Sequence, residues 1–548
     1  MTAETSPLLS IRDLSVQYRT RQGTVDAVSG VSFDVRAGEV TAVVGESGSG
    51  KTTVAQSVIG LLASNGSIAS GTITLNERRL GTTELVGLPE RRWRDLRGRC
   101  IGLIPQDPGN SLNPVQSVGK SISESLRIHG RPSRAEVHDR VHALLEQVGI
   151  DDPIKRAKQF PHEFSGGMRQ RVLIAAALAN DPELIIADEP TSALDVTVQR
   201  TVLDLIDKLR EETGTGVLFI THDLAVAADR ADSVVVMRGG EVQESGPAAQ
   251  VLAQPASAYT RQLMADAPSF GKLVERESIA VASGTPLIEV RELRQEFGRG
   301  ADAFVAVDGL SFSVARGTTH ALVGESGSGK TTTGRAIAGF AAPTSGSVRV
   351  DGVEVTELRG AKLREYRRTT QMVYQNPYGS LDPRHSIGQT LAEPLKNFGI
   401  GAGTRADRAQ RVAQALEVVS LPAEFAQRRP RELSGGQRQR VAIARALIVE
   451  PELVVLDEAV SALDVTVQAQ ILRLLARLQR DLGLTYVFIS HDLAVVRQIS
   501  DTVTVLQRGA QVEHGLTEDV FSNAQHPYTQ RLIDAIPGAS LSSGHWVI

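Results

Sequence analysis

Eight consecutive residues, Gly-Glu-Ser-Gly-Ser-Gly-Lys-Thr, occur twice in this chain, once from Gly45 and once from Gly324. Both copies fit GxxxxGK[ST], the pattern of a phosphate-binding loop. In each copy an apolar, strand-like stretch (40–44 and 321–323) leads into the loop, and a helical pattern begins at the lysine. Backbone N–H groups and the positive end of a helix then converge on phosphate oxygens. A chance Gly/Ser loop would not recur with identical fillers, so the sequence predicts two nucleotide-phosphate sites.

All residues of both loops are candidate nucleotide ligands. The lysines would neutralise the outer phosphates, and the threonine after each lysine would offer its hydroxyl to Mg²⁺. The candidates are Gly45, Glu46, Ser47, Gly48, Ser49, Gly50, Lys51, Thr52 and Thr53 in the first copy, and Gly324, Glu325, Ser326, Gly327, Ser328, Gly329, Lys330, Thr331 and Thr332 in the second.

The repeat extends well beyond the loops. Lys51 and Lys330 lie 279 positions apart, as do the aromatic residues Tyr18 and Phe297. Four later pairs lie 269 positions apart: Gln106 and Gln375, Ser165 and Ser434, Asp188 and Asp457, His222 and His491. The ten-residue difference falls between the Lys and the Gln, where the first copy has an extra polar stretch around 63–71. Such constant spacing indicates two copies of one fold.

Apolar strand segments alternate with helical segments in both halves. A strand at 184–187, a helix at about 196–209 and a strand at 217–220 predict an α/β domain with a mostly parallel sheet. Each copy also has a helix-rich insertion, at about 110–165 and 379–434.

The two halves are joined by a stretch rich in turn-forming residues. Residues 266–286 contain prolines and glycines without clear periodicity, which favours a short flexible linker. We therefore expect a first domain at 1–265 and a second at 287–548.

Charge, cysteine content and apolar run length exclude several kinds of partner and cofactor. A net charge of −4 gives no global cationic field, which argues against nucleic acid as the main partner. Cys100 is the only cysteine, which excludes internal disulfides and a multi-cysteine iron–sulfur cluster. The start of the chain lacks the pattern of a signal peptide, and the longest apolar run, 172–179, is far too short to span a membrane. If the protein moves a solute across a membrane, other chains must supply the pore.

Carboxylates and histidines follow apolar strands in both copies. A carboxylate at a strand end beside a phosphate loop can hold Mg²⁺, and a second carboxylate can polarise an attacking water. Either group alone would more often be structural, but repetition in register favours function. We assign metal binding to Asp188 and Asp457, general-base catalysis to Glu189 and Glu458, and contact with the terminal phosphate to His222 and His491.

Ser-Gly-Gly precedes a helical segment in each half, which offers a serine cap and an open helix N-terminus that suits an anion. With this motif the assembly resembles the ATP-binding cassette ATPases, whose signature is LSGGQ. Residues 433–437 match it, while 164–168 read FSGGM. The signature candidates are Ser165, Gly166 and Gly167 in the first copy, and Ser434, Gly435, Gly436 and Gln437 in the second.

The resemblance implies a head-to-tail pair of cassettes, each with a parallel sheet core, a helical signature subdomain and an antiparallel β part. Each ATP, with Mg²⁺, would lie between the loop of one cassette and the signature of the other, so that Lys51 faces Ser434 and Lys330 faces Ser165. One chain would thus hold a complete dimer with two hydrolytic sites. The altered FSGGM motif would serve the second of these sites.

The resemblance also assigns two further pairs. Tyr18 and Phe297 match the aromatic residue that stacks on adenine, although a strand aromatic in a core is the alternative. Gln106 and Gln375 match the glutamine that contacts Mg²⁺ and water and senses the membrane partner.

Strings after each glutamine resemble those of the ATPase subunits of dipeptide, oligopeptide and nickel importers. These are Gln-Asp-Pro with Ser-Leu-Asn-Pro in the first half, and Gln-Asn-Pro with Ser-Leu-Asp-Pro in the second. Residues 525–529, Gln-His-Pro-Tyr-Thr, resemble the carboxyl-terminal extension of those subunits, and the first half keeps Ala258-Tyr259-Thr260 of it. Some relatives carry an iron–sulfur cluster there, and with Cys100 alone this chain should not.

We therefore expect an ATPase that drives the import of dipeptides or oligopeptides. It would bind two transmembrane permease subunits, which receive substrate from an extracytoplasmic peptide-binding protein, and would lie peripherally on the cytoplasmic face of the cell membrane. A tandem ATPase of a nickel or glutathione importer is the alternative. An exporter ATPase, or a soluble cassette protein that acts on ribosomes or DNA, fits less well.

Overall fold

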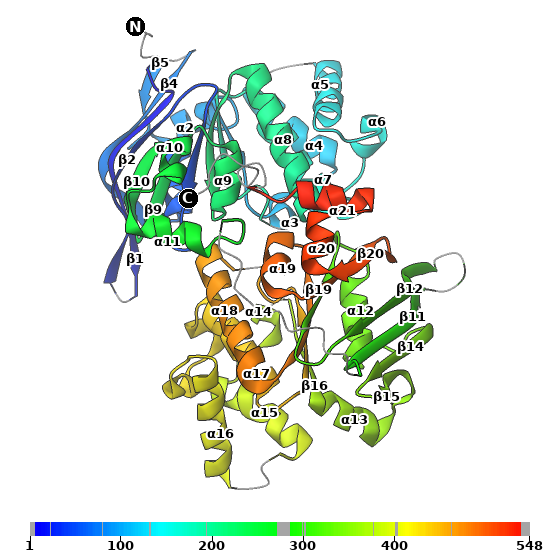
Figure 1. Ribbon diagram of the computed structural model, residues 1–548. Helices are drawn as coiled ribbons and strands as arrows, with labels where there is room; N and C mark the ends of the chain where they lie inside the picture. Colours follow the sequence, from blue (N-terminus) through cyan, green and yellow to red (C-terminus); the bar gives the residue numbers. More distant parts are fainter. Residues whose placement is uncertain are drawn as a thin grey trace. The chain divides into compact units, whose positions relative to one another are not determined.

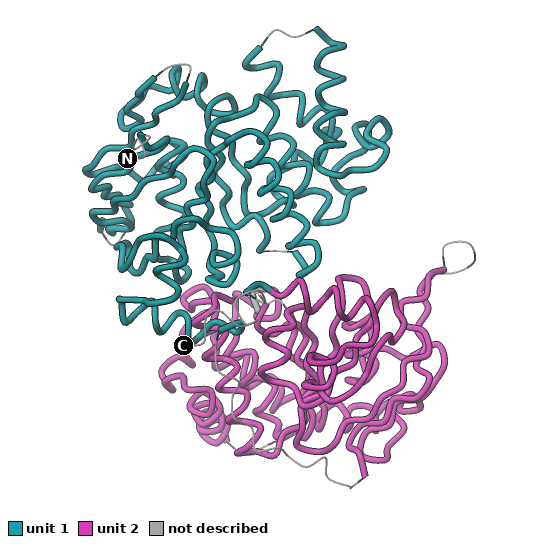
Figure 2. Tube along the Cα trace, turned by 45° about the horizontal axis from the view of Figure 1, so that its top comes forward, with its two compact units in different colours: residues 1–270, 537–548 teal, residues 271–536 magenta. Residues whose placement is uncertain are grey.

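The structure is a computed structural model of the chain (Figure 1). It describes residues 6–21, 23–78, 81–130, 133–192, 194–270, 285–298, 300, 303–375, 377–400, 404–461 and 463–538. The chain forms two compact units, one of residues 1–270 with 537–548 and one of residues 271–536 (Figure 2). Most of the expected linker, residues 271–284, lies outside the described residues.

A six-stranded sheet forms the centre of the first unit, in the order β10-β9-β3-β8-β7-β6. Neighbouring strands from β9 to β6 are parallel, and β10 is antiparallel to β9. The strands are β3 (Val40–Val44), β6 (Ile101–Ile104), β7 (Leu184–Asp188), β8 (Gly216–Thr221), β9 (Ser233–Arg238) and β10 (Glu241–Pro247).

The parallel sheet is buried on both faces. Val40, Ala42 and Val44 of β3 pack in one apolar cluster, and Val43 packs in another. Since alternate residues of a strand point to opposite faces, helices or other strands must cover both sides.

A second, antiparallel sheet has the order β2-β1-β4-β5 and contributes the blue strands of Figure 1. Its strands are β1 (Leu9–Thr20), β2 (Gly23–Val35), β4 (Gly66–Glu77) and β5 (Gly81–Glu84). The extra polar stretch of the first copy begins this β4 strand, whose Gly66 pairs with Tyr18 of β1.

The helices of the first unit confirm the expected helix-rich insertion, which holds α3 to α6. They are α1 (Lys51–Val58), α2 (Glu90–Leu96), α3 (Pro108–Ser111), α4 (Val118–His129), α5 (Arg134–Gln147), α6 (Pro153–Arg156), α7 (Gly166–Ala177), α8 (Val196–Thr213), α9 (Leu224–Arg230), α10 (Ala248–Ala253) and α11 (Ala258–Asp266). In α5, Val137, Val141, Leu144 and Leu145 form the buried stripe expected of an amphipathic helix.

The second unit repeats this plan in one ten-stranded sheet, because β12 and β20 pair at Asp308 and Ala510. The order is β15-β14-β11-β12-β20-β19-β13-β18-β17-β16. The strands are β11 (Ile288–Phe297), β12 (Phe304–Val314), β13 (Thr319–Val323), β14 (Ser345–Val350), β15 (Val353–Glu354), β16 (Thr370–Val373), β17 (Leu453–Asp457), β18 (Thr485–Ser490), β19 (Thr502–Gln507) and β20 (Ala510–Leu516).

Helices of the second unit follow the same sequence of elements. They are α12 (Lys330–Ile337), α13 (Gly360–Thr369), α14 (Pro377–Ser380), α15 (Ile387–Phe398), α16 (Arg405–Val418), α17 (Gly435–Leu447), α18 (Val465–Leu482), α19 (Leu493–Ile499), α20 (Thr517–Ser522) and α21 (Pro527–Asp534). Both units thus have the predicted α/β architecture, with a parallel core, a helical part and an antiparallel part. Among the described residues, no helix is long and apolar enough to cross a membrane.

Candidate nucleotide sites

Each phosphate loop joins the carboxyl end of a central strand to a helix, β3 to α1 and β13 to α12. Gly45 has φ 150° and Gly50 has φ 98°. A Cβ at Gly45 would lie 2.1 Å from the backbone oxygen of Met237, and one at Gly50 would lie 2.7 Å from that of Ala27. The loop is therefore packed so closely against neighbouring backbone that only glycine fits at these positions.

The lysine of each loop is buried. The Lys51 ammonium donates hydrogen bonds to the backbone oxygens of Gly45 and Glu46, at 2.7 and 2.8 Å. Lys330 donates to the matching oxygens of the second loop, both at 2.7 Å. The remaining predicted loop residues lie in the loop or the first helical turn: Ser47, Gly48, Ser49 and Thr53, and Ser326, Gly327, Ser328 and Thr332.

The structure brings the loop threonine to the strand-end aspartate in both cassettes. Thr52 Oγ1 donates to Asp188 Oδ1 at 3.3 Å, and Thr331 Oγ1 donates to Asp457 Oδ1 at 2.9 Å. Burial and the nearby charge of Glu189 raise the pKa of Asp188 to about 6. A hydroxyl beside a carboxylate is a donor set that fits a hard cation such as Mg²⁺.

The next carboxylate is held by the predicted glutamine and histidine. Gln106 Nε2 donates to Glu189 Oε2 at 2.8 Å, and His222 Nδ1 lies 3.2 Å from the same oxygen. Glu189 has φ 46°, a left-handed conformation that is uncommon outside glycine, and its N–H donates to the Ile220 oxygen of the neighbouring strand at 2.9 Å.

The second cassette repeats this arrangement. Gln375 Nε2 donates to Glu458 Oε2 at 2.7 Å, and His491 Nδ1 lies 3.3 Å from that oxygen. Glu458 has φ 48°. The sequence pattern and the structure therefore bring the same four side-chain types together twice.

Charge pairing determines the protonation of the glutamate and the histidine. Burial opposes ionisation of Glu189, but the hydrogen bond and charge of His222 outweigh it and lower the pKa of Glu189. Burial likewise opposes protonation of His222, and its interaction with Glu189 outweighs it and raises the pKa of His222. The pKa shifts of Glu458 and His491 have the same directions and causes. Each glutamate is therefore an ionised carboxylate at neutral pH, as a base requires.

The signature serines cap helices. Ser165 Oγ accepts from the N–H of Met168 at the start of α7, and Ser434 Oγ accepts from the N–H of Gln437 at the start of α17, both at 3.3 Å. Gln437 returns a bond, because its Oε1 accepts from the Ser434 N–H at 3.0 Å. Methionine has no such group, so the first signature lacks this reciprocal capping box.

The two aromatic candidates have different surroundings. The ring of Tyr18 is half-buried against Gly66, where an added Cβ would lie 2.6 Å from Tyr18 Cε1. Phe297 is 42% exposed and pairs across the strands with Phe304, which is 59% exposed, their ring centroids 5.7 Å apart. The structure adds Phe304 to the candidates.

Phe304 lies on a strand that is adjacent to the phosphate loop. Its strand passes beside the phosphate loop, since a Cβ at Gly329 would lie 2.5 Å from the backbone oxygen of Ala306. Phe304 is two positions along the strand from Ala306, a distance of about 7 Å.

Sequence reasoning also missed one tyrosine in each cassette that contacts the loop. The Glu46 N–H donates to Tyr259 Oη at 3.3 Å, and the Glu325 N–H donates to Tyr528 Oη at 3.1 Å. The two tyrosines lie 269 positions apart, in the same register as the four later pairs. This constant separation could have indicated a shared role for the two tyrosines. In the sequence both segments indicated only a resemblance to importer subunits.

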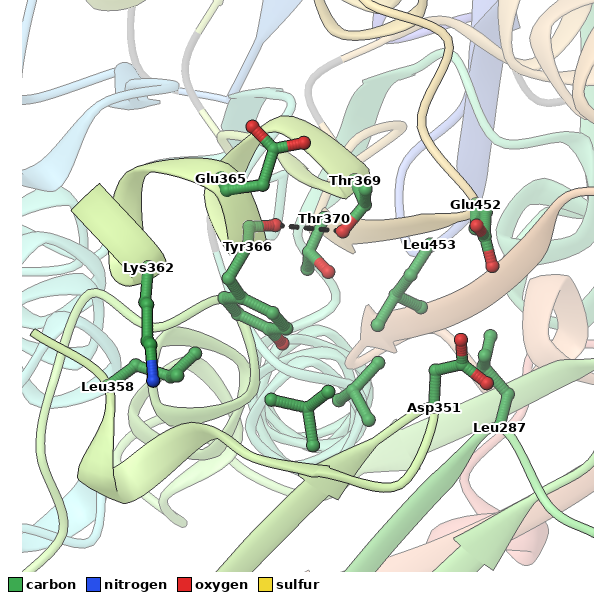
Figure 3. Close-up of a pocket in the computed structure, with 12 residues that line it drawn as sticks. Leu287, Asp351, Leu358, Lys362, Glu365, Tyr366, Thr369, Thr370, Glu452 and Leu453 are labelled. Carbon is green, nitrogen blue, oxygen red and sulfur yellow. Dashed lines mark hydrogen bonds between the residues drawn. The ribbon is translucent and has the colours of Figure 1, made fainter.

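A separate pocket of about 350 Å³ lies in the second cassette, lined by Lys362, Glu365, Tyr366 and Leu453 among others (Figure 3). Leu453 is the first residue of β17, whereas Asp457 is the last. The pocket is therefore at the opposite end of this strand from the loop, away from the strand ends where open α/β sheets bind ligands.

Comparison with known families identifies the class of protein. The family model described as "ABC transporter" matches residues 28–192 and 307–461, which include both loops and both Asp-Glu pairs. The chain belongs to this family and is an ATP-binding, ATP-hydrolysing subunit of a transporter. A second model, "Oligopeptide/dipeptide transporter, C-terminal region", matches residues 512–543.

Individual relatives match nearly the whole chain. The "Glutathione import ATP-binding protein GsiA" of Salmonella choleraesuis is 43% identical over 564 residues, covering 98% of this chain and 90% of the relative. The protein of the same name from Escherichia coli K12 is 43% identical over 566 residues, with the same coverage. The chain is thus a tandem ATPase of a peptide/nickel-type ABC importer, a class that works with permease and substrate-binding partners.

Proposed function

We propose that this chain energises the import of glutathione or a closely related short peptide. The observation that carries the proposal is the similarity, over 98% of the chain, to subunits named for glutathione import. Both cassettes and the carboxyl-terminal extension are present in one chain. This support favours the glutathione alternative over general import of dipeptides or oligopeptides.

In this proposal the cassettes are residues 1–265 and 287–548, joined by 266–286. Lys51 and Ser434 contact one ATP, and Lys330 and Ser165 contact the other, so that both sites are composite. The lysines carry positive charge to the outer phosphates, and the capped helix N-termini at the signatures receive the terminal phosphate from the other side. Tyr18 and Phe297 stack on the adenines.

Each ionised glutamate accepts a proton from the water that attacks the terminal phosphate. Gln106 and His222 hold the Glu189 carboxylate by the same oxygen, which fixes its direction. Thr52 and Asp188 would hold Mg²⁺, and the amide oxygen of Gln106 would be a further ligand. Mg²⁺ supplies neutralisation of phosphate charge when bound. The second cassette has the same roles: Gln375 and His491 hold Glu458, and Thr331 and Asp457 would hold Mg²⁺.

We place the permease contact of the second cassette at a hollow beside Gln375. It has a volume of about 310 Å³, and Phe340, Tyr374, Phe398 and Arg445 are among its lining residues. Phe340 and Tyr374 are 46% and 38% exposed. Exposed aromatic rings around a concave site suit the apolar face of a partner helix. A permease helix seated here would place the chain on the cytoplasmic face of the membrane, next to the glutamine that holds Glu458.

Uptake by cells tests the proposal. In cells that carry Lys51→Ala or Lys330→Ala, we expect uptake of labelled glutathione to fall to background, because the loops lose their cation. Lys362→Ala is the matched control, since this lysine lines the separate pocket and should leave uptake unchanged. Normal glutathione uptake with lost dipeptide uptake would assign the cargo to dipeptides instead. Normal uptake of glutathione, peptides and nickel chelates alike would remove the import assignment.

A further inference from the structure

We propose that Tyr259 and Tyr528 are positioning residues of the two phosphate loops. Tyr259 lies on α11 and Tyr528 on α21, in the carboxyl-terminal segment of each cassette. Through these tyrosines the segment would hold the loop in the conformation that receives ATP. The proposal rests on the assignment of both loops to ATP and adds a role for the importer-type extension.

The contact is formed twice, by residues far apart in the sequence. Each tyrosine accepts a hydrogen bond from the backbone N–H of the second loop residue, at 3.3 Å for Tyr259 and 3.1 Å for Tyr528. Their side chains are buried, with relative exposures of 7% and 3%. The two loops lie 279 positions apart and the two tyrosines 269. The contact therefore survives the ten-residue difference between the copies.

The bonded N–H belongs to the peptide that also anchors the lysine. The peptide between Gly45 and Glu46 donates its N–H to Tyr259, and its carbonyl oxygen accepts from Lys51 Nζ at 2.7 Å. A peptide unit is planar and rigid, so a rotation that moves one of these groups also moves the other. The tyrosine hydroxyl and the lysine ammonium thus fix one peptide plane from its two sides. The second loop has the same pair of contacts on its first peptide.

The tyrosines are themselves held in place. The Glu244 carboxylate of β10 accepts from the N–H groups of Ala256 and Ser257, at 2.7 and 3.1 Å, which fixes the turn before α11. In the second cassette the Glu513 carboxylate of β20 accepts from Gln525 and His526, at 2.8 and 3.2 Å. In each cassette a set of contacts therefore runs from β10 or β20, through the turn before the tyrosine helix, to the phosphate loop.

Loss of the hydroxyl would leave a loop N–H without this acceptor and free the peptide to rotate. One hydrogen bond of this kind corresponds to about a fivefold change in an equilibrium constant. The proposed general-base carboxylates follow other strands, β7 and β17. The effect should therefore appear in nucleotide affinity and KM, with kcat changed less than about twofold.

The test uses the full chain with Tyr259→Phe, Tyr528→Phe and both together. Phenylalanine keeps the buried ring and removes only the oxygen. Binding of a ribose-labelled fluorescent ATP with Mg²⁺ gives Kd, and steady-state hydrolysis gives KM and kcat. We expect Kd and KM to rise about fivefold in the double variant.

Tyr486→Phe is the matched control. Tyr486 is buried on β18 and its hydroxyl donates to the Leu475 oxygen at 3.1 Å, away from the loop. Like Tyr259→Phe and Tyr528→Phe, this variant loses one buried hydrogen bond, so it should lower the melting temperature about as much as either of them does. It should leave KM unchanged. A double variant that binds the nucleotide as tightly as the original chain, or a control that raises KM equally, would overturn the proposal. Because this test reads nucleotide affinity and the uptake test reads transport, failure of one is distinguishable from failure of the other.

Discussion

The aromatic rings proposed to stack on adenine differ in their surroundings between the two cassettes. Tyr18 is half-buried against a neighbouring strand, whereas Phe297 is exposed and packs on a second ring, Phe304. Tyr18 pairs with Gly66 of β4, and the Arg19 N–H donates to the Asn65 oxygen at 2.8 Å. In the second cassette the pairing of β11 with β14 ends at Arg294 and Ser345, three residues before Phe297. The strand beside the first aromatic ring is therefore the longer one, with 12 residues in β4 against 6 in β14, and this difference lies at the proposed base site.

The cores of the two parallel sheets also differ. His320 of β13 is fully buried, with Nδ1 2.8 Å from Thr502 Oγ1 and Nε2 3.1 Å from Thr504 Oγ1, and it stacks on Phe312. The matching residue of β3 is Thr41, whose hydroxyl donates to the Asp34 oxygen at 3.2 Å. At this matching position the second cassette therefore has a buried side chain that can take up a proton, whereas the first cassette does not.

The largest expected effect tests what the cassettes share. Because the geometry around Glu189 and Glu458 is the same, Glu189→Gln and Glu458→Gln should each reduce hydrolysis at their own site by about 10²- to 10⁴-fold. Phosphate release by the full chain should therefore fall to about half in either single variant and by about 10²- to 10⁴-fold in the double variant, whereas the exposed Glu450→Gln should leave it unchanged. Full activity in either active-site variant would refute two hydrolytic sites.

The next effect tests the buried histidine. Burial and the charge of His514 lower the pKa of His320 to about 3, below its ordinary 6.5. The unfolded chain therefore takes up a proton as the pH falls through 6.5, while the folded chain does not until about pH 3. Stability of the second cassette is lost over this interval, by about 2 kcal/mol at pH 5.

Hydrogen exchange, corrected for intrinsic rates, can read this effect strand by strand. Amides of β13 should lose more protection than those of β3 between pH 7 and pH 5. In His320→Thr, which copies the first cassette, the difference should disappear. Equal losses in both strands of the original chain would contradict the assignment.

A smaller effect concerns the base platform. If adenine also stacks on Phe304, Phe304→Val should weaken ATP binding at the second site about three- to tenfold. The affinity is measured in a Lys51→Ala chain, so that only the second site binds ATP. The reciprocal Val25→Phe, in a Lys330→Ala chain, should strengthen binding at the first site. Tripolyphosphate, which has no base, serves as the competitor control, and equal weakening of its binding would exclude a base contact.

The smallest effect concerns the signature caps. Met168→Gln should complete the capping box at α7 and stabilise the first cassette by about 0.5 kcal/mol, and Gln437→Met should cost the second cassette a similar amount. Denaturant unfolding of both variants would show this. A Met168→Gln chain less stable than the original would mean that Met168 contributes more by packing.

Spacing was enough to predict that the Asp-Glu pair and the histidine of each cassette lie close together. The strands that end at Asp188 and Thr221 flank each other in a parallel sheet, with β3 next in line. Carboxyl ends of parallel strands meet at one edge, so residues after each strand must come together. The α/β fold and the helix-rich insertions followed from apolar periodicity in the same way.

Contacts that depend on strand register or on distant packing were not predictable. Whether Gly66 faces Tyr18 depends on the register of β4 against β1, which polar spacing does not determine. The bond between Tyr259 and the first loop joins segments 213 positions apart, and no local pattern marks a tyrosine as a partner of a backbone N–H. Phe304 and His320 lie in strands whose composition is ordinary for their class.

The left-handed backbone at Glu189 and Glu458 has a consequence for how this chain could evolve. A residue with a Cβ in that conformation loses about 1 kcal/mol relative to glycine. A glycine at either position would therefore give a more stable cassette that lacks its proposed general base. Both copies of the repeat carry glutamate there, so thermal stability and the proposed hydrolysis oppose each other at these two positions.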